Sequence, residues 1–84
     1  MNINLYDIIN KHPKFSYHIF GDQIEFINNI KHYTIKVIVT QQGDLIIMSN
    51  DKYKLGWNIL VDKQYFRQEE IEKDLQLFLG PLED

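Results

Sequence analysis

The chain has 84 residues, of which 44% are hydrophobic and 13% aromatic, and this composition excludes a disordered segment. It contains no cysteine, which excludes a disulfide framework and a thiolate metal site and fits a reducing cytoplasm. No apolar run approaches the roughly 20 residues of a membrane-spanning helix, so we expect no membrane partner. We interpret residues 1–84 as a single domain.

The net charge of −3 is unevenly distributed. Residues 1–42 carry four lysines against Asp7, Asp22 and Glu25, whereas residues 43–84 carry nine acidic and five basic residues. An acidic half disfavours binding to a phosphate backbone, which requires Lys and Arg. It favours a protein partner with a basic surface, although solubility alone is the simpler explanation.

The N-terminus has the signals of a short helix. Asn4 is a suitable N-cap, and Asp7 lies in the first turn, where free N–H groups and the helix dipole favour a carboxylate. Pro13 ends the helix, which should span residues 5–11. Four apolar residues are expected to face the sheet: Ile3, Leu5, Ile8 and Ile9.

Five segments with alternating apolar residues follow, which is the period of a strand with one buried face. The clearest pair is a hairpin closed by a turn around Gly43, within residues 32–49. The expected strands cover residues 15–20, 23–28, 32–40, 44–49 and 53–61. In the fifth, Trp57 falls in an alternating row and is predicted to be mostly buried.

The last element is a helix near residues 66–79, with an apolar stripe at helical spacing formed by Ile71, Leu75, Phe78 and Leu79. Gly80 and Pro81 predict its end. The expected fold class is therefore α+β. An antiparallel meander of four to five strands is flanked by a short N-terminal helix and a C-terminal helix, in two layers.

No motif indicates catalysis. The three histidines lack metal-ligand spacing and are expected at the surface, and no nucleophile or phosphate-binding signature is present. We therefore predict no enzyme, no catalytic residue, no metal and no cofactor. Three runs of aromatic and basic residues come nearest to a nucleic-acid stacking site: Lys31-His32-Tyr33, Tyr53-Lys54 and Lys63-Gln64-Tyr65-Phe66-Arg67. Most of these aromatics fit core positions, so no direct nucleic-acid partner is expected.

Four carboxylates on the last helix form an acidic cluster: Glu69, Glu70, Glu72 and Asp74. Helical spacing places Glu70 with Asp74, and Glu69 with Glu72. The simpler interpretation is a solvated helix surface. The functional one is a row of carboxylates that meets Arg and Lys side chains that normally bind DNA phosphates.

Short motifs spread over most of the chain support the second interpretation. They include Met1-Asn2-Ile3-Asn4, Gly56-Trp57-Asn58, Glu69-Glu70-Ile71 and Asp74-Leu75-Gln76. With these motifs the chain resembles small phage-encoded anti-CRISPR proteins of the Listeria-prophage type, which inhibit type II-A RNA-guided nucleases. It departs from them at Lys14, where the family has an acidic residue, and in lacking the helix that precedes Gly-Trp-Asn.

The resemblance implies a fold of a helix, a three-stranded antiparallel sheet and further helices. It also implies a DNA mimic that acts in the cytoplasm of a host bacterium. Such a protein binds a guide-loaded type II CRISPR effector nuclease and blocks the cleft that reads the short duplex motif beside the target. Carried over by position, partner-binding residues are then expected in the hairpin turn and on the last helix: Gly43, Asp44, Glu69, Glu70 and Asp74. The acidic cluster adds Glu72 to this predicted contact set. The alternative, from another class, is a small non-enzymatic protein-interaction domain of unknown pathway.

Overall fold

A computed structural model describes residues 3–79, apart from the side chain of Phe78. The burial expected for Phe78 and the helix end expected at Gly80 and Pro81 lie outside the described part. The elements are α1 (Leu5–Lys11), β1 (Ser16–Phe20), β2 (Gln23–Asn29), β3 (Tyr33–Thr40), β4 (Asp44–Asp51), β5 (Asn58–Gln64) and α2 (Gln68–Leu79). This order confirms the predicted α+β class.

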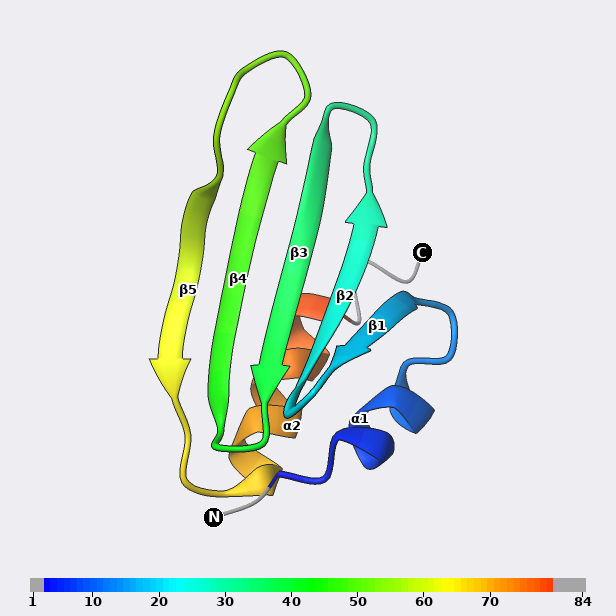
Figure 1. The fold of residues 1–84 in the computed structure, drawn as a ribbon, viewed down its shortest axis with the longest axis vertical. Coiled ribbons are helices and arrows are strands. Elements are labelled where there is room, and N and C mark those ends of the chain that lie inside the picture. The colour runs from blue at the N-terminus through cyan, green and yellow to red at the C-terminus, as the bar shows by residue number, and fades with distance from the viewer. Residues whose placement is uncertain (1–2, 80–84) are drawn as a thin grey trace.

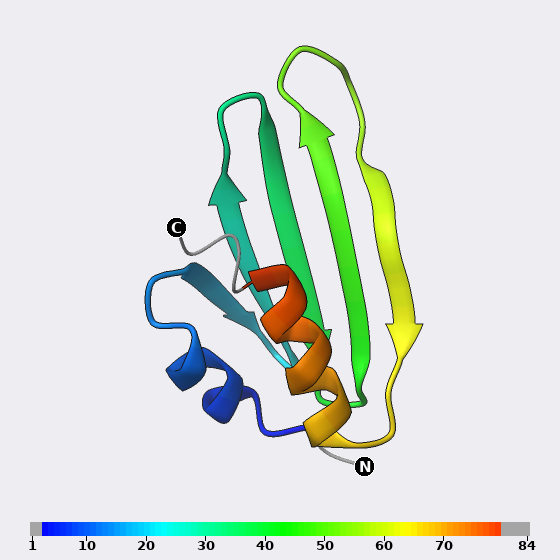
Figure 2. The ribbon, with the colours of Figure 1, turned by 180° about the vertical axis from the view of Figure 1, so that it is seen from behind.

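The five strands form one antiparallel sheet in the order β1-β2-β3-β4-β5, so each hairpin lies beside the previous one. Both helices lie on the same side of the sheet, which gives two layers (Figures 1 and 2). They cover only the half near the β3–β4 turn. The other half of β3, β4 and β5 extends beyond them, in a molecule with extents of 39 × 23 × 23 Å.

The core lies between the helices and the covered half of the sheet. The alternation predicted for the central hairpin is confirmed, because Val37 and Val39 pair with Ile47 and Leu45 and all four are buried. β2 contributes Ile24 and Phe26 to the core, and α2 contributes fully buried residues of its apolar stripe. The helical core residues are Ile3, Leu5, Ile8 and Ile9 near α1, and Ile71, Leu75 and Leu79 on α2.

The start of α1 is built as its sequence predicts. The side chain of Asn4 accepts a hydrogen bond from the backbone N–H of Asp7 at 3.2 Å, which caps the helix. The backbone N–H of Ile3 donates to the carbonyl of Gln41 at 2.8 Å, so the β3–β4 turn fixes the chain just before the helix.

The fifth strand is displaced from its predicted position: it covers Asn58–Gln64 rather than residues 53–61. Residues 52–57 form a loop instead, because Asp51 initiates a turn. The side chain of Asp51 accepts from the N–H of Tyr53 at 2.9 Å, and its carbonyl accepts from the N–H of Lys54 at 3.0 Å. Of the alternating apolar residues at positions 53, 55, 57, 59 and 61, only Val61 packs against the core.

The prediction that Trp57 is mostly buried is wrong, since it is 42% exposed. Its ring lies 4.4 Å from the ammonium of Lys36, which projects from the face of the sheet opposite the helices. The helical layer does not reach this part of the sheet. The expectation of surface histidines is wrong for His12, which is 4% exposed and packs edge-on against the rings of Phe15 and Phe26.

Candidate functional site

The acidic cluster predicted on the last helix lies on the N-terminal half of α2. Burial of Ile71 and Leu75 fixes the rotation of the helix about its axis, and Glu69 and Glu70 are therefore exposed. Neither carboxylate forms a hydrogen bond or an ion pair with residues 3–79. These two carboxylates are available to a partner without loss of an internal contact.

Glu72 has a different environment, because it faces α1. One carboxylate oxygen lies 2.8 Å from the ammonium of Lys11, and the other accepts from the side-chain amide of Gln68 at 3.0 Å. Burial raises the pKa of Glu72, but the hydrogen bonds from Lys11 and Gln68 outweigh that effect and hold the pKa below its usual value. Glu72 thus joins the two helices.

Asp74 accepts a hydrogen bond from the hydroxyl of Tyr65, a residue of the β5–α2 connection that is only 5% exposed. Burial of the ring and the adjacent Asp74 carboxylate raise the pKa of the Tyr65 hydroxyl to about 12. Asp74 is half-buried beside this ring, so its first role is to satisfy a buried hydroxyl.

The β3–β4 turn meets the same tyrosine. The backbone N–H of Tyr65 donates to the carbonyl of Gly43 at 2.9 Å. Gly43 has a φ of +97°, and a Cβ on it would lie 2.3 Å from the carbonyl oxygen of Tyr65, so only glycine fits. Asp44 is half-buried and bonds to Thr40: its carboxylate accepts from the hydroxyl at 3.1 Å, and its N–H donates to that hydroxyl at 3.0 Å.

Tyr65 therefore connects the predicted turn residues to the acidic helix, through its backbone on one side and its hydroxyl on the other. This role of Tyr65 is not among the predictions from the sequence. The signal in the sequence is the pair of aromatic residues Tyr65-Phe66 just before the last helix, but the sequence does not indicate which of the two rings is buried. Of the six predicted partner-binding residues, Glu69 and Glu70 are freely exposed, and the other four hold the fold together.

A pocket of about 410 Å³ is lined by Lys63, Gln64, Tyr65, Phe66, Glu70, Lys73 and Asp74. Two ammonium groups therefore lie near two of the predicted carboxylates, and the exposed ring of Phe66 lies beside them. The surface around Glu70 combines both signs of charge with an aromatic side chain. Such a mixture suits a protein surface as a partner.

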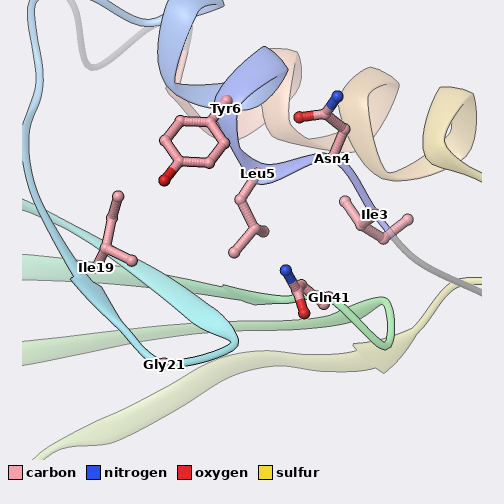
Figure 3. A pocket seen from close by; sticks show the side chains of 7 residues that line it. All are labelled: Ile3, Asn4, Leu5, Tyr6, Ile19, Gly21 and Gln41. Carbon is pink, nitrogen blue, oxygen red and sulfur yellow. The ribbon is translucent and has the colours of Figure 1, made fainter.

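A second pocket of about 410 Å³ lies between the start of α1 and the β1–β2 turn (Figure 3). Its lining residues are Ile3, Asn4, Leu5, Tyr6, Ile19, Gly21 and Gln41, which include no carboxylate, imidazole or amine side chain. Within residues 3–79 no three His, Cys, Asp or Glu residues are grouped to hold a metal ion. Neither helix in this part of the chain is long and apolar enough to cross a membrane.

Comparisons of the chain with family models, with curated proteins and with solved structures give no match. The anti-CRISPR resemblance therefore rests on its short motifs. The three-stranded sheet that it implies is not found, because residues 3–79 form a five-stranded sheet.

Proposed function

We propose that this protein inhibits a guide-loaded type II nuclease by acidic DNA mimicry. In this proposal α2 enters the DNA-binding cleft in the bacterial cytoplasm, and its carboxylates take the place of DNA groups that Arg and Lys side chains bind. Carboxylates form strong, charge-assisted hydrogen bonds with these cations. The protein itself performs no chemistry.

The observation that carries the proposal is the state of Glu69 and Glu70. Both are exposed on the first turn of α2, and neither has an ion pair within residues 3–79 that a partner must break. Binding therefore breaks no internal contact of these two carboxylates, and its cost is the loss of their hydration water, which the charge-assisted hydrogen bonds to the partner have to exceed. The helix itself is held rigidly by the buried Ile71 and Leu75, which limits the entropy lost on binding.

The other predicted residues have a supporting role in this proposal. Asp74 and Glu72 add negative charge beside the contact residues while they keep their bonds to Tyr65 and Lys11. α2 carries four carboxylates against the single cation Lys73, so its net charge is negative, and a negative charge accelerates association with a basic cleft at low salt. Gly43 and Asp44 shape the turn that supports Tyr65.

The test is DNA cleavage by a guide-loaded type II-A nuclease in the presence of wild-type protein and of the variant Glu69→Lys with Glu70→Lys. The wild type should inhibit at micromolar excess, and the variant should not. A matched control reverses two exposed acids elsewhere, Asp22→Lys with Asp62→Lys, which changes the net charge by the same amount and should inhibit like the wild type.

Reversal at Glu69 and Glu70 removes negative charge from a helix N-terminus, so it should destabilise the protein by about 1 kcal/mol. Circular dichroism must therefore show that the variant is folded at the assay temperature. Lack of inhibition by the wild type against several type II-A enzymes would refute the nuclease proposal. Equal inhibition by all three proteins would show that these carboxylates are not the contacts.

The alternative, a non-enzymatic protein-interaction domain of another pathway, is favoured by one observation. Leu77, on α2, is 66% exposed, and Phe66, just before the helix, is 73% exposed. Exposed apolar side chains beside charged ones are typical of a protein–protein interface. Pull-downs from bacterial lysates with and without a type II-A effector distinguish the two: capture of the same protein from both lysates favours the alternative.

A further inference from the structure

Two loops meet at the end of the sheet that extends beyond the helices. We define the distal tip as residues 30–32 of the β2–β3 connection, Tyr33 at the start of β3, and residues 52–57 of the β4–β5 connection. The backbone N–H of Lys52 donates to the carbonyl of His32 at 3.0 Å, and its ammonium donates to the carbonyl of Ile30 at 2.9 Å. The rings of His32 and Tyr53 lie 5.6 Å apart. The two loops therefore form one surface.

The distal tip exposes apolar and aromatic side chains. Leu55 is fully exposed, Tyr53 is 78% exposed, and Tyr33 and Trp57 are each nearly half exposed. A fully exposed leucine at the end of a loop contributes nothing to the core. Together with three surrounding aromatic rings, it forms an apolar patch of the kind that marks an interaction site.

The same surface is positively charged, in contrast to the whole protein. It contains Lys31, Lys52 and Lys54 and no acidic residue, and the side chain of the adjacent Asp51 already accepts a hydrogen bond from Tyr53. Lys31 and Lys54 are exposed and make no ion pair with residues 3–79. The charge of the distal tip is complementary to an anionic partner.

We propose that the distal tip docks on the surface of an anionic lipid bilayer. Leu55 enters the edge of the acyl region, and Tyr53 and Trp57 lie at the headgroup level, where amphipathic rings are favoured. Lys31 and Lys54 meet the phosphates of the lipid headgroups. One inserted leucine, two interfacial rings and two lysines give weak, reversible binding to the bilayer surface, comparable to that of a single lipid anchor.

The positions of the rings favour a bilayer over a nucleic-acid strand. Tyr33 belongs to the face of β3 that contains the buried Val37, whereas Trp57 lies over Lys36 on the opposite face. One strand of bases cannot stack on both faces, but a bilayer surrounds the whole tip. Leu55 at the apex has no π-face for stacking but does have an aliphatic side chain that lipid accepts.

The position of the exposed carboxylates is consistent with docking of the distal tip on an anionic bilayer. The N-terminus of α2, with Glu69 and Glu70, lies at the opposite end of the long axis from the distal tip (Figures 1 and 2). The exposed carboxylates thus stay away from anionic lipid when the tip is docked. The sequence alone predicts no membrane partner, because no segment is long enough to span a bilayer and the alternation at residues 53, 55 and 57 predicts a buried strand face.

Trp57 is the only tryptophan in the chain, so its fluorescence reports on the distal tip directly. The full-length protein is titrated with phosphatidylglycerol–phosphatidylcholine vesicles and with pure phosphatidylcholine vesicles, and bound protein is measured by co-sedimentation. Anionic vesicles should shift the emission of Trp57 to shorter wavelength and protect it from acrylamide. Binding should weaken about fivefold for each lysine neutralised in Lys31→Gln and Lys54→Gln.

The decisive variant is Leu55→Asp, with Leu77→Asp as its matched control on the exposed side of α2. Both side chains are exposed, so both variants should keep the wild-type melting temperature within a few degrees. Leu55→Asp should bind anionic vesicles at least about tenfold more weakly because the inserted side chain becomes charged, whereas Leu77→Asp should bind like the wild type.

Unchanged Trp57 emission in the presence of anionic vesicles would overturn the proposal without reference to any variant. Equal binding by Leu55→Asp and the wild type would overturn it as well, since the contact would then lie elsewhere. A response of Trp57 to a single-stranded oligonucleotide but not to vesicles would replace the bilayer with nucleic acid as the partner.

Discussion

Replacement of Gly43 by alanine tests how the β3–β4 turn supports the acidic helix. Gly43 and Gly56 have nearly the same φ, +97° and +94°. A Cβ on Gly56 meets nothing within 4 Å, whereas one on Gly43 meets the carbonyl oxygen of Tyr65 at 2.3 Å. Because that oxygen belongs to the backbone, the β5–α2 connection has to move.

The two substitutions therefore share the strain of a left-handed alanine, about 1–2 kcal/mol, but differ in what else they disturb. In Gly43→Ala the hydrogen bond from Tyr65 to the Gly43 carbonyl is lost, at about 1 kcal/mol. The bond from the Tyr65 hydroxyl to Asp74 weakens as well, which adds a further 1 kcal/mol or so. Gly43→Ala should be less stable than Gly56→Ala by about 2 kcal/mol.

For a domain of this size that difference corresponds to a melting temperature about 8–16 °C lower for Gly43→Ala than for Gly56→Ala. Thermal unfolding followed by circular dichroism at pH 7 measures it directly. The Gly56→Ala protein is the control for strain alone. Equal melting temperatures for the two variants would show that the contact between Gly43 and Tyr65 does not constrain the turn.

Three further predictions concern Tyr65, Glu72 and Trp57. The pKa of the Tyr65 hydroxyl is raised to about 12, above the unfolded value of about 10, so its contribution is fully present below pH 10 and is lost as pH rises toward 12. The free energy of unfolding in urea should therefore fall more steeply between pH 10 and 12 for the wild type than for Tyr65→Phe, and parallel slopes would contradict this. The pKa of Glu72 is lowered, so its contribution is present above the unfolded value of about 4.3 and is lost as pH falls through the lower folded value. Glu72→Gln should flatten the acid side of the stability profile below about pH 4, and a profile as steep as that of the wild type would refute the role given to Lys11. Trp57→Ala should cost only about 1 kcal/mol, since the exposed ring loses chiefly its contact with the Lys36 ammonium, whereas Leu75→Ala in the core should cost about 2–5 kcal/mol. An equal decrease in melting temperature for the two variants would show that Trp57 packs in the core.

The local elements of the fold were predictable because their signals are short-range. The cap at Asn4, the stop before Pro13 and the alternation around Val37 each depend on residues within a few positions, and the structure confirms the elements they predict within about two residues. The exposure of Glu69 and Glu70 was also predictable, because the buried stripe of α2 fixes which side faces solvent.

The partners of the other carboxylates were not predictable from spacing. Lys11 and Glu72 are 61 positions apart, and their ion pair exists only because α1 and α2 pack side by side on one face of the sheet. The bond between Tyr65 and Asp74 likewise depends on the angle at which the chain leaves β5 and enters α2. Helical periodicity predicts on which side of the helix a residue lies, but it does not predict which side chain of another element that residue meets.

The sequence by itself determined which segments alternate and which side of each strand is apolar. Only the tertiary structure decided where that apolar side is covered, because the two helices together span just half the length of the sheet. Leu45 and Leu55 have equally apolar side chains, yet the first is fully buried beneath the helices and the second is fully exposed beyond their reach. Burial requires a second surface to pack against, and the alternation of a strand carries no information on how far that surface extends.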